Sequence, residues 1–126
     1  MSDRLTQNFH LAELQCNDGT PVPEEFHANA LAICERAQAL RDIVGPLKVV
    51  SGYRTPAWNS RVGGARKSQH LTASALDLRS ALHPSSTLHA LYLDLIRKGE
   101  VPDGGLGFYP TFIHIDVGRP RRWTVK

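Results

Sequence analysis

Two short segments of the sequence carry residues that could bind a metal ion. In the first, His70 precedes Asp77 by seven positions, and in the second, Asp116 follows His114 by two. Two histidines and one aspartate form a complete set of protein ligands for a catalytic zinc, whose fourth position is left for water. A metal-free interpretation is also open, in which Asp77 pairs with an arginine and His114 makes a hydrogen bond in the core.

Both segments are predicted to be strands, and strand geometry decides which of their side chains share a face. In residues 73–78, Asp77 points to the same side as two small alanines, and in residues 112–117, His114 and Asp116 point away from an apolar face. A carboxylate buried without a partner is costly, so Asp77 needs a cation or a hydrogen-bond donor. The pattern predicts a polar site on one face of an apolar sheet.

The elements around these strands predict a small α+β domain. Apolar residues recur at intervals of three and four in residues 23–45 and 87–98, which predicts two main helices, with Ser85 or Ser86 as the N-cap of the second. Residues 47–51 and 106–109 are predicted strands, and a short helix is expected after Pro56. The late strands lie too close together for parallel crossovers. We therefore expect a small antiparallel or mixed sheet that carries the metal site, with the two helices packed against it.

The composition fits one domain over residues 1–126 and excludes several functional classes. The chain is 41% hydrophobic and 21% charged, which excludes a disordered tail. Its formal net charge of +3 is too small to indicate a nucleic-acid-binding surface. No run reaches the roughly 18 apolar residues of a membrane span, and Cys16 and Cys34 lack the CxxC spacing of a cysteine metal site. We expect a monomer with no nucleic acid partner and no membrane span.

Four motifs, in order along the chain, resemble those of a known family. Residues 51–56, Ser-Gly-Tyr-Arg-Thr-Pro, are similar to S-G-Y-R-[ST]-P, and residues 68–77 match S-x-H-x-x-G-x-A-x-D at the serine, the histidine, the second alanine and the aspartate. Residues 104–110 and 112–116 are similar to G-G-x-G-x-Y-P and F-V-H-x-D. The chain thus resembles the zinc D-Ala-D-Ala carboxypeptidases and their murein endopeptidase relatives, the LAS metallopeptidases, and within them a compact, VanY-like subgroup. The resemblance extends to the N-terminal arm and to Arg122-Trp123.

The resemblance implies a role for each residue of the site. The Zn²⁺ ligands would be His70, Asp77 and His114. Arg54 would donate hydrogen bonds to a carbonyl or carboxylate of the substrate, or would instead be a surface arginine that pairs with a loop carbonyl. Ser68 and Gln69 would contact the substrate backbone or shape the turn before the first histidine.

Two positions depart from the family pattern. Ala73 stands where the family usually has glycine, and would be strained if the position needs a positive φ. Thr111 stands where several relatives carry an acidic general base, so Asp116 is the nearest substitute for a base that would take a proton from the metal's water. Asp116 could instead accept the free N–H of a ligand histidine. If Asp116 is not the general base, Asp103 is the first of the remaining loop carboxylates to test for that role.

The implied function is a zinc-dependent peptidase that cleaves a peptide bond in peptidoglycan stem peptides or cross-links. The candidate bonds are D-Ala-D-Ala, L-Ala-D-Glu and a diaminopimelate cross-link. The N-terminal segment lacks the apolar core of a secretion signal, so we expect synthesis in the cytoplasm and action at the cell wall after release or export. A phage or prophage endolysin and an exported bacterial enzyme both fit. The alternative function is a non-catalytic zinc domain that binds cell-wall peptide.

Overall fold

A computed structural model describes residues 3–126 as an α+β fold, as the sequence predicts. The described part of the chain contains three α-helices, five strands and three short 3-10 helices. The elements run in the order 3-10 helix Leu11–Leu14, 3-10 helix Glu24–Phe26, α1 His27–Val44, β1 Lys48–Ser51, α2 Pro56–Arg61, 3-10 helix Gln69–Thr72, β2 Ala75–Arg79, α3 Ser85–Arg97, β3 Gly105–Phe108, β4 Ile113–Asp116 and β5 Arg121–Thr124. No helix within residues 3–126 is long and apolar enough to cross a membrane.

The five strands form one mixed sheet in the order β1-β2-β4-β3-β5. The neighbours β1/β2, β2/β4 and β3/β4 are antiparallel, and β3/β5 is parallel. In the pairing of β2 with β4, Asp77 lies opposite His114 and Ala75 lies opposite Asp116. Directly opposed residues of an antiparallel pair bring their side chains together on one face. The register therefore places the predicted polar residues side by side.

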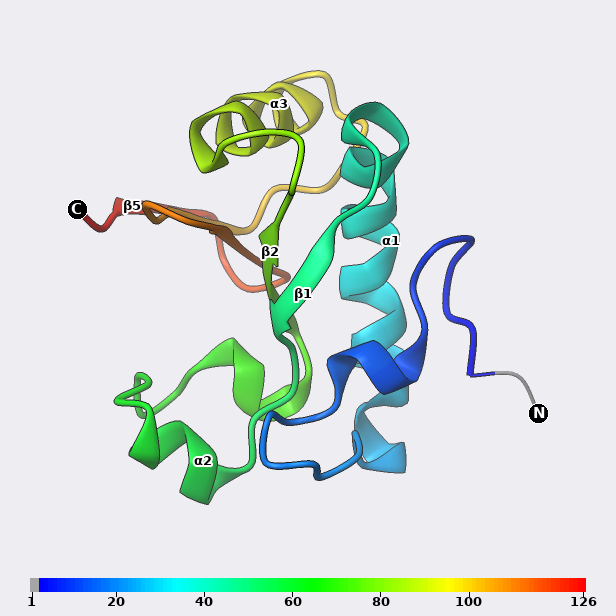
Figure 1. The fold of residues 1–126 in the computed structure, drawn as a ribbon, viewed down its shortest axis with the longest axis vertical. Helices are drawn as coiled ribbons and strands as arrows, with labels where there is room; N and C mark the ends of the chain where they lie inside the picture. The colour runs from blue at the N-terminus through cyan, green and yellow to red at the C-terminus, as the bar shows by residue number, and fades with distance from the viewer. Residues whose placement is uncertain (1–2) are drawn as a thin grey trace.

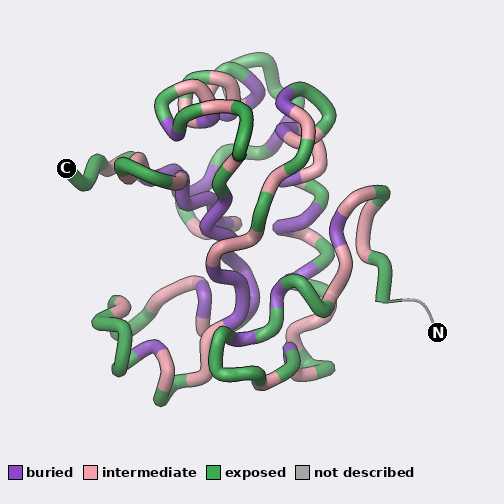
Figure 2. Tube along the Cα trace, in the orientation of Figure 1, coloured by how far each residue is buried: buried purple, intermediate pink, exposed green. Residues whose placement is uncertain are grey.

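The opposite face of the sheet packs against α1 and α3. Leu76, Leu78, Ile113 and Ile115 alternate with the polar residues along β2 and β4, and all four are fully buried in the hydrophobic core. Figure 1 shows α1 running beside the sheet, and α2 at the lower left of the view, away from α1. In Figure 2, the purple of buried residues runs along the central strands and recurs along α1. One face of the sheet thus stabilises the fold and leaves the other for the site.

The structure differs from the sequence prediction at three places. The strand β2 begins at Ala75 and not at residue 73, because Ala73 has a left-handed backbone with φ +57°. The prediction that Ser85 or Ser86 caps α3 is wrong: Pro84 occupies the N-cap, and the Ser85 hydroxyl donates to the carbonyls of Tyr109 and Pro110. The strand β5 is absent from the prediction, because its sequence Arg-Arg-Trp-Thr is short and mostly polar.

Candidate metal centre

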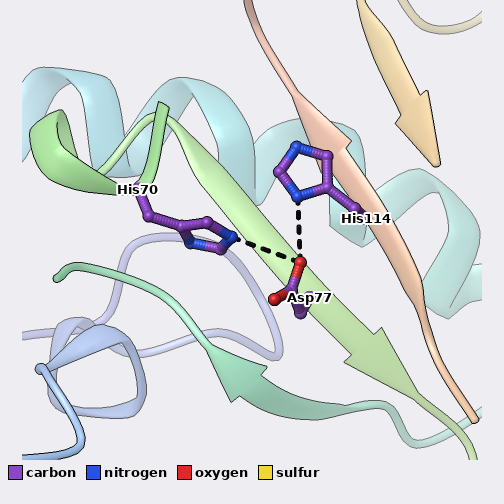
Figure 3. A group of neighbouring side chains, drawn as sticks. All are labelled: His70, Asp77 and His114. Carbon is purple, nitrogen blue, oxygen red and sulfur yellow. Dashed lines mark hydrogen bonds and ion pairs between the residues drawn. The ribbon is translucent and has the colours of Figure 1, made fainter. Parts of the chain in front are cut away.

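Three elements bring a histidine, an aspartate and a second histidine to one point on the polar face of the sheet. His70 lies in the 3-10 helix before β2, Asp77 in the middle of β2 and His114 on β4. Figure 3 shows both rings turned toward the Asp77 carboxylate. One ligand atom from each residue lies within 4.8 Å of the other two, and all three residues are buried. The structure thus brings together the three residues predicted as ligands.

Local hydrogen bonds fix the first histidine. The Ser68 hydroxyl accepts from the His70 backbone N–H at 3.2 Å and so caps the 3-10 helix. The backbone N–H of Arg54 donates to the His70 carbonyl at 2.9 Å. The Gly52 carbonyl lies 2.6 Å from His70 Nδ1. Only glycine fits at position 52, because a Cβ there would come within 2.8 Å of the Leu14 backbone.

The partners of the two rings leave both inner nitrogens as acceptors. A carbonyl oxygen only accepts, so Nδ1 of His70 carries the proton that is donated to Gly52. Nε2 of His114 likewise donates to Oδ2 of Asp116 at 2.7 Å. In the neutral rings, Nε2 of His70 and Nδ1 of His114 then direct lone pairs at Oδ1 of Asp77, at 3.2 and 2.9 Å. Three acceptors facing one another are stable only with a positive charge between them, either a proton on one ring or a metal ion.

These residues fit a Zn²⁺ ion. Two imidazole nitrogens and one carboxylate oxygen are a ligand set of catalytic zinc sites. Tetrahedral zinc with bonds of about 2.0–2.1 Å places its ligand atoms roughly 3.3 Å apart. The separations of Asp77 Oδ1 from the nitrogens of His70 and His114, 3.2 and 2.9 Å, are close to that value. Both aspartate–histidine separations therefore suit a shared Zn²⁺ ion.

The electrostatics of the site favour charge on Asp77, Asp116 and His114. Burial raises the pKa of Asp77, but its interactions with His114 and His70, in which a protonated ring donates to the carboxylate, outweigh burial and hold this pKa well below its usual range. For Asp116, burial acts in the same direction and is outweighed by hydrogen bonds from His114 and Arg121, so its pKa is also lowered. Burial lowers the pKa of His114, whereas its bonds to Asp116 and Asp77 raise it, with a net increase. Both carboxylates are therefore anionic at neutral pH.

Asp116 is almost completely enclosed and has donors on both oxygens. Its Oδ2 accepts from Nε2 of His114 at 2.7 Å, and Nη2 of Arg121 donates to both oxygens at 2.6 and 2.7 Å. Its Oδ1 also accepts from the backbone N–H groups of Gly105 and Gly118 at 3.0 and 2.9 Å. Asp116 is 1% exposed. The carboxylate thus holds the second histidine and is itself held by three other groups.

Arg54 lies at the site and not on an exposed loop. Its Nη2 is 3.5 Å from Oδ2 of Asp77, the oxygen that the histidines leave free, and its side chain is 16% exposed. Its Nε donates to the Ser51 hydroxyl and its Nη1 to the amide oxygen of Asn59. These contacts hold the planar guanidinium beside Asp77. The surface-arginine alternative does not describe this environment.

A cavity of about 510 Å³ opens in front of the three candidate ligands. Arg54, Ser68 and Gln69, all predicted to bind substrate, contribute to its lining. Among the described residues that line it, the carboxylates are Asp77 and Asp116. Asp103 is not part of this lining, and its carboxylate pairs with Arg122 at 2.7 Å. The structure therefore brings the predicted ligands, the substrate-binding residues and Asp116 to one cavity.

Sequence reasoning did not assign several other residues to the cavity, and three of them contact the site residues or one another. Arg121, Trp123 and Tyr109 line it together with the ligands. Arg121 and Trp123 belong to the unpredicted strand β5. The available signals are the motif around Tyr109 and the Arg-Trp pair near the C-terminus, which contribute to the resemblance without indicating a role in the site.

Comparison with known proteins gives two matches. Residues 7–116 match the family model described as peptidase M15. A zinc D-Ala-D-Ala carboxypeptidase of Streptomyces albus G is 40% identical over 78 residues, which cover 56% of this chain. The match covers 31% of that relative, so the chain corresponds to less than a third of its length.

Proposed function

Since the chain belongs to the peptidase M15 family, we propose that it is a zinc peptidase that hydrolyses a peptide bond in bacterial peptidoglycan. The observation that carries the proposal is the buried His-Asp-His group, whose ligand atoms converge within 4.8 Å at one cavity. The similarity to a zinc D-Ala-D-Ala carboxypeptidase supports a cell-wall peptide as substrate.

We assign the metal to His70, Asp77 and His114, and the substrate to the cavity in front of them. Zinc held there would supply Lewis acidity, which activates water and polarises a peptide carbonyl. The Gly52 carbonyl and the Asp116 carboxylate fix the orientations of the two rings. They accept hydrogen bonds of 2.6 and 2.7 Å from the ring nitrogens that face away from Asp77. Such outer partners keep a ligand in its metal-binding tautomer.

Arg54 is the proposed electrophilic residue. Its guanidinium lines the cavity and lies beside Asp77, so that a peptide oxygen near the ligands comes within its reach. A planar guanidinium with several N–H donors suits a carbonyl or carboxylate oxygen. Ser68 and Gln69 follow on the same wall and are proposed to contact the peptide backbone. The Ser68 hydroxyl also accepts from the backbone N–H of His70. Ser68 therefore contributes to the local fold as well as to the proposed binding of substrate.

For Asp116, the contacts favour an orienting role over that of general base. A base needs a free lone pair directed at the reacting water, whereas both Asp116 oxygens accept from donors within the protein. One of these donors would have to leave before Asp116 could take a proton. We therefore propose that Asp116 mainly orients His114. Replacement of Asp116 by asparagine distinguishes this role from that of a general base.

The charge of the cavity supports an anionic peptide. Arg54, Lys67 and Arg121 line it, against the two carboxylates of Asp77 and Asp116, and zinc would add two further positive charges. Peptidoglycan stem peptides carry free carboxylates, which such a cavity attracts. The proposed place of action is the cell wall, reached after release or export, either as an endolysin or as a bacterial enzyme. The scissile bond is D-Ala-D-Ala, L-Ala-D-Glu or a diaminopimelate cross-link.

Digestion of purified peptidoglycan, with mass analysis of the products, tests the proposal. We expect new peptide termini with the zinc-loaded chain, and none after treatment with a chelator or with His114→Ala. The masses of the products identify the bond. If the zinc-loaded protein binds peptidoglycan and releases no product, the chain is the non-catalytic binding domain instead.

A further inference from the structure

Three aromatic side chains form one wall of the cavity, and the proposed mechanism does not use them. Tyr109, Phe112 and Trp123 all line the cavity that contains the candidate metal ligands. The rings of Tyr109 and Phe112 are stacked, with centroids 4.4 Å apart and an interplanar angle of 12°. The Trp123 ring lies 5.0 Å from the ring of His114. This wall therefore begins directly beside a candidate ligand.

The Tyr109 hydroxyl is held with its own proton free. Trp123 Nε1 lies 3.1 Å from the Tyr109 oxygen and donates to it, because an indole N–H is only a donor. The tyrosine oxygen is thus the acceptor of this bond, and its O–H remains available. Within residues 3–126 the hydroxyl makes no other hydrogen bond. A polar donor at the edge of a cavity is left for a ligand.

The surrounding structure fixes both members of this pair. The turn that carries Tyr109 is closed by a backbone bond from its N–H to the Phe112 carbonyl at 3.1 Å, and the Ser85 hydroxyl on α3 donates to the Tyr109 carbonyl at 2.7 Å. Trp123 reaches its position only because Gly107 has no side chain: a Cβ there would overlap the indole ring. The tyrosine hydroxyl is therefore positioned before any substrate binds, which lowers the entropic cost of using it.

We propose that the Tyr109 hydroxyl donates a hydrogen bond to a carbonyl or carboxylate oxygen of the bound peptide, an inference that rests on the proposed function. Peptide oxygens need donors, and the carboxylates of Asp77 and Asp116 offer none when ionised. Arg54 supplies donors from the loop after β1, whereas Tyr109 supplies one from the turn between β3 and β4. Tyr109 is thus a substrate-binding residue, and Trp123 is the residue that positions it.

The test compares Tyr109→Phe with the wild-type chain. Phenylalanine keeps the ring that stacks on Phe112 and removes the hydroxyl, and with it both the free donor and the acceptor of the Trp123 N–H. Zinc content should be unchanged, and the thermal midpoint should fall by only a few degrees, as it should in Trp123→Phe, which loses the same bond. With a synthetic peptide ending in D-Ala-D-Ala and with purified peptidoglycan, we expect kcat/KM to fall by at least about threefold, as for the loss of one hydrogen bond. The same peptide should bind about 3- to 10-fold more weakly to the chelator-treated variant than to chelator-treated wild type.

Two further variants make the result specific. Trp123→Phe removes the indole N–H that orients Tyr109, and should lower kcat/KM less than Tyr109→Phe does. Tyr92→Phe removes a hydroxyl from a buried tyrosine on α3 that does not line the cavity, and should leave kcat/KM unchanged. Wild-type turnover in Tyr109→Phe overturns the inference and leaves the proposed function intact. If the wild-type chain itself releases no product from either substrate, the proposed function fails first.

Discussion

The role of Asp116 can be decided by replacing it with asparagine. Asp116→Asn keeps the shape of the side chain and exchanges one carboxylate oxygen for an N–H donor. The amide oxygen can still accept from the two backbone N–H groups that now contact Oδ1. The amide nitrogen then faces Nε2–H of His114 and the guanidinium of Arg121, so donors meet donors where the carboxylate accepts at 2.7 and 2.6 Å. The substitution therefore acts mainly on the orientation of His114.

The magnitude follows from what each role would lose. If Asp116 orients His114, losing this partner should weaken zinc binding by about 10–100-fold, which is about 1.4–2.8 kcal/mol at 1.4 kcal/mol per tenfold. Arg121 adds little to this figure, since its Nη2 can still donate to the amide oxygen at the position of Oδ1, now 2.7 Å away. If Asp116 is instead the general base, the rate should fall by roughly two to four orders of magnitude with zinc affinity nearly intact.

The assay measures zinc affinity and turnover separately. Zinc dissociation constants come from competition with a coloured chelator, and the turnover rate is then measured at saturating zinc. Asp103→Asn is the matched control, since Asp103 makes an exposed pair with Arg122 outside the cavity lining and should leave both quantities unchanged. If turnover falls by about two orders of magnitude or more while zinc affinity stays at the wild-type value, the orienting role is refuted and Asp116 is the base.

The other predictions concern one ligand, one donor and one backbone position. His114→Ala should lose zinc measured by metal analysis, whereas equal zinc in variant and wild type would remove His114 from the site. Arg54→Lys keeps the charge but loses the fork of donors, and should lower kcat/KM by at least about tenfold at unchanged zinc content; unchanged kinetics would make Arg54 structural. Ala73→Gly should change the unfolding free energy by less than about 1 kcal/mol in denaturant titrations. Relief of about 1–2 kcal/mol of left-handed strain is there offset by a lost buried methyl, ~0.8 kcal/mol, and a more flexible unfolded chain. A loss of several kcal/mol would show that the methyl packs better than this reasoning allows.

The predictions from sequence succeeded where side-chain periodicity carries the information. Alternation along residues 112–117 placed His114 and Asp116 on a face opposite the apolar residues, and the structure has Ile113 and Ile115 in the core on the other side. The same reasoning placed Asp77 on the polar face of its strand. Periodicity does not contain the register, however. That Asp77 lies opposite His114 is set by the pairing of β2 with β4, two strands separated by a helix and another strand.

The contribution of β5 could not be predicted for a different reason. Its four residues alternate between half-buried and exposed, and it joins the sheet as a parallel partner of β3. A short polar strand at an edge has no apolar period to reveal it, and a parallel partner is distant in the chain. Arg121, which holds Asp116, and Trp123, which holds Tyr109, were therefore invisible as site residues, although their residue types are suited to these roles.

The two candidate ligand histidines are oriented by different kinds of partner, and this difference explains which partner could be recognised from the sequence. His114 is held by the side chain of Asp116, a carboxylate two positions away in the sequence, so a role beside the metal could be considered from the residue types alone. His70 is held by a backbone carbonyl, which every residue possesses. At that position the sequence has only Gly52, whose missing side chain lets the chain pass against Leu14 and present that carbonyl. A glycine in a motif can thus orient a candidate metal ligand through its backbone, without contributing any side-chain atom to the site.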